Sequence, residues 1–155
     1  MGTHHIDQSA TSTAAPAEIW PLLADAATWS DWAPFTESAL DRPAPSGDPN
    51  GVGAHRRFHR GRRVTREEVV AFEAPSHFAY RLLSGVRGVR DYRADVTLAP
   101  TGDGGTAISW RSTFDATPGT GWLVVAVLGR FIGQTARALA TAAEDRAARQ
   151  TRAAD

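Results

Sequence analysis

The sequence contains neither cysteine nor lysine among its 155 residues. Without cysteine the chain can form no disulfide, no thiolate nucleophile and no cysteine-ligated metal site. Without lysine it can form no Schiff base with a carbonyl substrate, and it lacks the residue with which a P-loop holds phosphate. These two absences exclude several large classes of enzyme.

The charges of the chain also balance, since it contains 17 arginines and 17 acidic residues and its formal net charge is zero. A global electrostatic attraction to nucleic acid or to membranes is not expected from this balance. Residues 1–13 contain no apolar run of the kind found in signal peptides, so we expect no export and a cytoplasmic location.

The last quarter of the chain predicts one long helix from Gly121 to Arg149. This stretch holds about 29 residues without proline, which corresponds to a helix of ~43 Å. Small residues recur along it at steps of three and four and so share one face, namely Ala126, Gly129, Gly133, Ala136, Ala140 and Ala143. A glycine inside a helix costs about 1 kcal/mol relative to alanine. We therefore expect this face either to pack closely on a sheet or to leave space for a ligand.

The preceding part of the chain predicts a strand, two short helices and six further strands. The first strand covers residues 6–13, and the short helices cover residues 16–25 and 28–32, with Pro16 at the first helical position. The later strands are expected over residues 35–42, 54–60, 62–73, 77–84, 89–99 and 106–116. Alternating apolar and polar residues in the last of them indicate an antiparallel sheet with one dry face, which can curl around the long helix.

Four stretches of the chain carry a family resemblance, and they stand at residues 15–32 (APAEIWPLLADAATWSDW), 66–82 (REEVVAFEAPSHFAYRL), 104–116 (GGTAISWRSTFDA) and 120–145 (TGWLVVAVLGRFIGQTARALATAAED). In this order they resemble the helix-grip superfamily of START-like and pollen-allergen-like proteins, and within it the polyketide cyclase/dehydrase branch. The resemblance implies one α+β domain over residues 1–155, with an ordered core of about residues 4–150. It implies the helix-grip fold, in which a seven-stranded curved antiparallel sheet wraps around a long C-terminal helix and two short helices follow the first strand.

The resemblance further implies an apolar cavity between sheet and helix that holds a hydrophobic or aromatic small molecule. The sequence contains no metal or nucleotide motif, so we expect no cofactor. The residues expected to line it are Phe58, Phe72, Tyr80, Tyr92, Trp110, Phe114, Val125, Leu128, Gly129, Ile132 and Gly133. The function would be binding of this molecule, with or without cyclase or dehydratase chemistry on a polyketide-like substrate. The alternative is a non-catalytic lipid carrier or sensor that contacts a membrane or a partner protein.

Polar residues on the predicted dry faces are candidates for acid/base catalysis, and they are Glu68, Tyr80 and Tyr92, with Ser112 and Arg56 as further polar groups. A buried carboxylate without a partner has a raised pKa, which suits an acid or base. The alternative for Glu68 is an ion pair with a neighbouring arginine, and the alternative for the tyrosines is a place in the core. A one-residue change of register near Gly61 would exchange Glu68 for Glu67.

The remaining charged features predict neither a metal site nor a nucleic-acid site. His55 and His59 would lie ~13 Å apart along one strand and cannot share a metal ion. The six arginines of residues 55–66 form either a solvated hairpin or an anion patch, and they lack the stacking aromatics of a nucleic-acid surface apart from Phe58. In the carrier hypothesis, Trp122 and Phe131 would contact a membrane.

Overall fold

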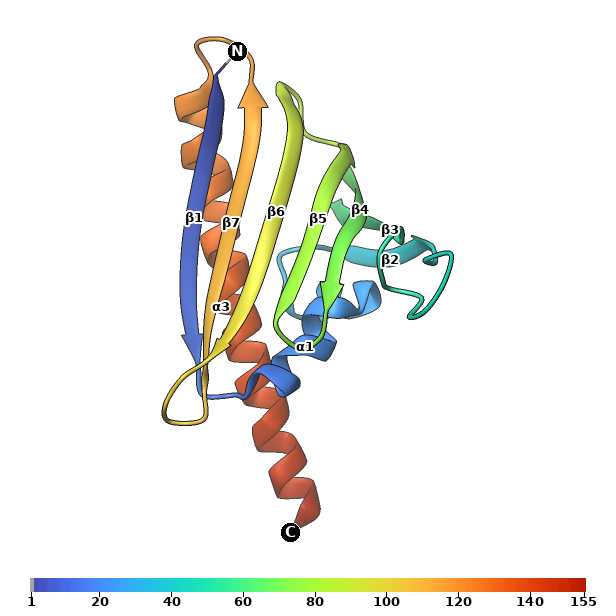
Figure 1. The fold of residues 1–155 in the computed structure, drawn as a ribbon, viewed down its shortest axis with the longest axis vertical. Coiled ribbons are helices and arrows are strands. Elements are labelled where there is room, and N and C mark those ends of the chain that lie inside the picture. Colours follow the sequence, from blue (N-terminus) through green and yellow to red (C-terminus); the bar gives the residue numbers. More distant parts are fainter. Residues whose placement is uncertain (1) are drawn as a thin grey trace.

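A computed structural model, which describes residues 2–155, has one antiparallel sheet of seven strands that lies along a long C-terminal helix (Figure 1). The strands are β1 (Thr3–Ser12), β2 (Glu37–Arg42), β3 (His55–Arg60), β4 (Arg63–Glu73), β5 (His77–Ser84), β6 (Val89–Pro100) and β7 (Thr106–Ala116). The helices are α1 (Pro16–Ala24), the 3-10 turn η1 (Ala26–Thr28), α2 (Trp29–Trp32) and α3 (Gly121–Ala154). Their order in the sheet, β1-β7-β6-β5-β4-β3-β2, confirms the predicted helix-grip fold.

The short helices α1 and α2 follow β1 because local signals begin and end them there. Pro16 occupies the first turn of α1, and the Glu18 carboxylate accepts a hydrogen bond of 2.9 Å from the Ala15 amide. Asp25 ends the helix, and its carboxylate accepts a hydrogen bond of 3.0 Å from the Ala27 amide at the start of η1. This sharp turn places Trp29 against the sheet, where its side chain is buried next to Phe58 and Trp110.

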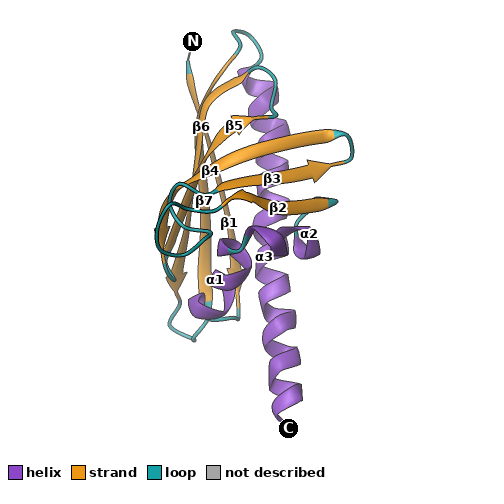
Figure 2. Ribbon diagram, turned by 90° about the vertical axis from the view of Figure 1, so that its right-hand side faces the viewer, coloured by secondary structure: helices purple, strands orange, loops and turns teal. Residues whose placement is uncertain are grey.

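Helix α3 packs chiefly against β1 and to a lesser extent against β7 and α1, and its C-terminal turns extend past the sheet (Figure 2). Its buried side contains the predicted small residues from Gly129 to Ala143 together with Ile132 and Leu139. By length and composition α3 could also cross a membrane, but in this fold it is the core helix.

Several register shifts interrupt the sheet, and one in β4 changes which side chains face its concave side. In β4 the register shifts between Val69 and Ala71, so that Val69 and Phe72, three positions apart, are paired with the inward residues Tyr80 and Phe78 of β5. In β6 the register shifts between Arg90 and Arg93. The curved sheet therefore presents aromatic residues from β3 to β7 to one interior.

Candidate functional site

An arginine stands at the centre of this interior. Arg56 of β3 has no solvent-exposed surface, and its guanidinium carbon lies over four aromatic rings. The distances from this carbon to the ring centroids are 4.7 Å for Trp29, 5.0 Å for Phe58, 4.7 Å for Phe78 and 5.4 Å for Tyr80. A guanidinium at these distances is attracted by the faces of the rings, which partly offsets the loss of its hydration.

The partner of Arg56 is Glu67 on the neighbouring strand β4. One guanidinium nitrogen, Nη2, donates a hydrogen bond of 2.6 Å to the Glu67 carboxylate, which is itself buried. The prediction that Glu68 faces the interior is therefore wrong. Glu68 lies on the outer face, where it accepts a hydrogen bond of 2.6 Å from Arg81 and lies 3.7 Å from His55. The bulge in β4 is the reason, because counting back from the inward Phe72 in steps of two reaches Glu68 only in a regular strand.

Arg56 and Glu67 do not fully compensate each other's burial. Burial raises the pKa of the Glu67 carboxyl, and the nearby positive charge of Arg56 opposes this shift without cancelling it. Two guanidinium nitrogens of Arg56, Nε and Nη1, are buried and find no hydrogen-bond partner within residues 2–155. Unpaired buried donors are costly, so they mark a place where an acceptor oxygen would be stabilising.

The two tyrosines of the chain lie next to this pair and are both buried. Trp110 donates a hydrogen bond of 3.2 Å from its indole nitrogen to the Tyr80 hydroxyl, and the Tyr92 and Ser112 hydroxyls share one of 2.8 Å. Burial raises the pKa of Tyr92 to about 12 and raises that of Tyr80 well above its ordinary value. Both phenols are therefore protonated at neutral pH and can act as hydrogen-bond donors.

The structure brings the predicted aromatic residues into one chain of ring contacts. Trp29 lies 5.2 Å from Phe58 and 5.9 Å from Trp110, measured between ring centroids. From Trp110 the contacts continue through Tyr80 and Tyr92 to Phe114, with centroid distances of 6.4, 6.3 and 6.0 Å. Phe72 lies at the other end of the interior, where its ring contacts those of Trp20 and Phe78.

The predicted residues of α3 divide into two groups. Ile132 is buried in the core, and Val125 and Leu128 are half-buried and packed against it. The two glycines instead face β1, where a Cβ atom on Gly129 would lie 3.7 Å from the Gln8 amide nitrogen and one on Gly133 would lie 2.9 Å from its amide oxygen. At these two positions the structure favours close packing on the sheet over an open space, and ligand contact by the glycines stays a prediction.

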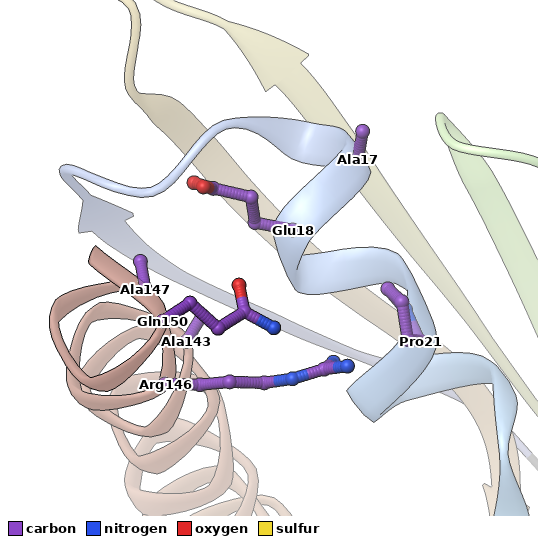
Figure 3. A pocket seen from close by; sticks show the side chains of 7 residues that line it. All are labelled: Ala17, Glu18, Pro21, Ala143, Arg146, Ala147 and Gln150. Atoms are coloured by element: carbon purple, nitrogen blue, oxygen red, sulfur yellow. The ribbon is translucent and has the colours of Figure 1, made fainter. Parts of the chain in front are cut away.

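Two hollows flank α1 on the outside of the molecule. The first has a volume of about 120 Å³ and lies between α1 and the C-terminal half of α3, with Glu18, Arg146 and Gln150 projecting into it (Figure 3). The second, of about 550 Å³, is lined by residues of α1, η1, α2 and the loop before β3. Neither hollow is lined by a residue predicted to bind the ligand.

Several residues of this interior were not predicted as site residues. Trp29 and Phe78 are not among the expected lining residues, and Glu67 is expected inside only if the register near Gly61 changes by one residue. The signal for Arg56 is the alternation along Ala54, Arg56 and Phe58, which places an arginine between two apolar residues on the dry face. The position of Trp29 depends on the turn at Asp25, which periodicity does not reveal.

Comparison with known proteins agrees with this architecture. The sequence model of the family described as polyketide cyclase / dehydrase and lipid transport matches residues 3–144. No curated protein matches the chain in sequence.

Solved structures show the same fold at low identity. A START superfamily protein from Mycobacterium smegmatis is 16% identical with a TM-score of 0.77, over 92% of this chain and 98% of that one. A point mutant of norcoclaurine synthase from Thalictrum flavum is 16% identical with a TM-score of 0.70, over 94% and 96% of the two chains. The di-domain aromatase/cyclase StfQ of the steffimycin biosynthetic pathway is 14% identical with a TM-score of 0.78, and the match covers 94% of this chain and 52% of that one.

Proposed function

The chain belongs to the polyketide cyclase/dehydrase and lipid transport family, and we propose that it binds a hydrophobic or aromatic small molecule in the interior between the sheet and α3. Apolar walls with a few convergent polar groups are typical of small-molecule sites. The aromatic residues of β3, β5, β6 and β7 would supply the walls, and the polar groups would be those of Arg56, Glu67, Tyr80 and Tyr92.

One observation carries this proposal, namely the buried guanidinium of Arg56 with two unpaired donors. In a purely structural core such unpaired donors lower the stability of the fold. In a binding site an oxygen of the ligand would accept hydrogen bonds from them. The surrounding rings of Trp29, Phe58 and Phe78 would hold the aromatic or aliphatic part of the same molecule. The ligand we propose is therefore hydrophobic and carries at least one carbonyl, enol or carboxylate oxygen.

The same groups would support cyclase or dehydratase chemistry on a polyketide-like substrate. Glu67, whose pKa is raised by burial, would take the place of Glu68 as the acid or base. Tyr80 and Tyr92 would donate hydrogen bonds to a carbonyl or enolate oxygen, since both phenols keep their protons. The interior would hold a flexible substrate in one productive conformation.

Binding in this interior requires rings to separate. The ring centroids in the aromatic chain lie between 4.8 Å (Trp29 to Trp32) and 6.4 Å (Tyr80 to Trp110) apart, so the side chains contact one another directly. Val125, Leu128 and Phe131 of α3 are only partly buried against this cluster, so they can move with less loss of packing than its fully buried members.

The proposal is tested by mass spectrometry of compounds extracted from the purified protein, followed by titration of the stripped protein with whatever is found. The variant Arg56→Met/Glu67→Leu removes both charges while keeping apolar volume, so the interior stays packed. We expect this variant to lose affinity for an oxygen-bearing aromatic ligand at least tenfold. Equal affinity of variant and wild type would refute the role of Arg56, and the absence of binding to any extracted or aromatic compound would refute the proposal itself.

A second candidate function uses the same interior without turnover, as a lipid carrier or sensor. The exposed apolar start of α3 favours it, because a carrier has to load and unload at a surface. Incubation of the extracted compound with the protein separates the two. An enzyme converts the compound in a way that depends on Glu67, whereas a carrier returns it unchanged.

A further inference from the structure

The first two turns of α3 expose large apolar side chains although the helix is the core of the fold. Trp122 is 72% exposed, Leu123 is 49% exposed and Val127 is 60% exposed. Only two other large hydrophobic side chains of residues 2–155, Val52 and Leu83, are exposed to a comparable degree. Three such residues within two helical turns indicate an interaction surface rather than scattered surface residues.

The exposed side of α3 changes from apolar to cationic along the helix. Arg130 and Arg137 follow Leu123 on this side at intervals of seven residues, which returns to nearly the same direction on an α-helix. Both arginines are exposed, and neither has a carboxylate partner within residues 2–155. The helix contains no acidic residue before Glu144.

A second source of positive charge lies beside the same helix. The guanidinium carbon of Arg60, at the end of β3, lies 4.9 Å from the ring centroid of Phe131, one helical turn after Val127. The hairpin of β3 and β4 extends across α3 at this level (Figure 2). The turn of that hairpin adds Arg62 and Arg63, which are exposed and have no acidic partner among the residues described.

We propose that this surface docks the protein on a membrane that contains anionic lipids. We call it the docking face and define it by Trp122, Leu123, Val127, Arg130, Arg137 and Arg60. The apolar start of α3 would enter the boundary between headgroups and acyl chains, where an indole is favourable. The arginines would remain at the level of the phosphate groups, and each contributes about a fivefold gain in affinity for an anionic surface.

Charge decides between a membrane and a second copy of the chain as the occupant. A two-fold symmetric contact through the docking face would bury the arginines of both copies in one interface. Neither residues 55–66 nor residues 121–143 contain an acidic side chain that could neutralise them. An anionic lipid surface supplies the missing negative charge, whereas a self-association through this face does not.

The test is co-sedimentation of the full-length protein with vesicles of phosphatidylcholine alone and of phosphatidylcholine mixed with phosphatidylserine. We expect binding to the mixed vesicles only, and a loss of that binding as salt is added. Trp122→Gln/Val127→Gln should reduce binding at least tenfold, and Arg130→Gln/Arg137→Gln should reduce it by more than tenfold and abolish the preference for phosphatidylserine. The matched controls are Val52→Gln, an exposed apolar residue away from α3, and Arg111→Gln on the convex face of β7, and both should bind as the wild type does.

Three results would overturn the proposal. These are no binding of the wild type to mixed vesicles, equal loss of binding in the control variants, and wild-type dimers in solution that Trp122→Gln/Val127→Gln dissociates. Because the altered side chains are exposed, the variants should keep the unfolding midpoint of the wild type, which shows that lost binding is not lost folding. The docking face is separate from the interior, so this test and the ligand titration can succeed or fail independently.

Discussion

Arg56 and Glu67 stand directly opposite each other on β3 and β4 and form an ion pair of 2.6 Å inside the aromatic interior. Arg81 and Glu68 form a pair of the same 2.6 Å length on the outer face of the same sheet. The two pairs share this N–O distance but differ in burial. They therefore allow the energetic consequence of burying an ion pair to be measured within one protein.

Breaking the inner pair should cost much more stability than breaking the outer one. Arg56→Met leaves the Glu67 carboxylate buried without its partner, and we expect a loss of about 3–5 kcal/mol in the free energy of unfolding. Arg81→Met removes an exposed partner and should cost at most about 1 kcal/mol. Urea unfolding measures both values. The double variant Arg56→Met/Glu67→Leu should recover most of the loss, and a double variant as unstable as Arg56→Met would contradict this account.

The raised pKa of Glu67 also predicts how stability depends on pH. Above pH 4.5, the ordinary value for this group, the unfolded chain loses the Glu67 proton before the folded protein does. The folded state then binds more protons than the unfolded state, so the contribution of Glu67 to stability falls as pH rises toward its folded pKa. The wild type should therefore lose stability relative to Glu67→Gln as the pH rises, so its unfolding free energy minus that of the variant should decrease. Urea unfolding at a series of pH values measures this difference, and a shift in the opposite direction would show that the pKa is lowered.

The sequence alone predicted the elements of this fold well, because strand periodicity and turn residues are local signals. The bounds predicted for β5 and β7 agree with the structure, and those of the other strands differ by a few residues at their ends. Tyr92, Ala94, Val96 and Leu98 do share the inner face of β6, as their alternation predicted.

The interior was predicted less well because two of its features are not periodic. The bulge in β4 adds one residue between Val69 and Phe72, which moves Glu67 inward and Glu68 outward. Trp29 reaches Arg56 through the turn that Asp25 makes after α1. Small residues on α3 are compatible with either a void or close packing, and the positions of Ile6 and Gln8 on β1 distinguish these at Gly129 and Gly133.

The two glycines of α3 should respond differently to alanine. At Gly129 the added Cβ would meet its nearest neighbour at 3.7 Å, an ordinary contact, so the gain in helix propensity should raise the unfolding free energy by about 1 kcal/mol. At Gly133 the added Cβ would lie 2.9 Å from the Gln8 amide oxygen, which then has to move. We expect Gly133→Ala to be less stable than Gly129→Ala, as measured by thermal or urea unfolding. Equal gains for both would mean that Gln8 leaves its place without cost.

The two tyrosines allow a direct test of the closed interior, because the chain contains no others. Burial raises the pKa of Tyr92 to about 12, and that of Tyr80 is raised well above 10.0 by burial and by the nearby Tyr92 and Glu67. In an alkaline titration followed by phenolate absorbance, the folded protein should therefore show no ionisation near pH 10. Since both pKa values are raised, the unfolded state ionises first and stability falls as pH rises above 10, so the phenolate signal should appear together with unfolding. Tyr92→Phe should halve the final signal without creating an early step. A reversible step near pH 10 in the folded protein would mean that solvent reaches a phenol, and that the interior is open where Tyr80 and Tyr92 meet.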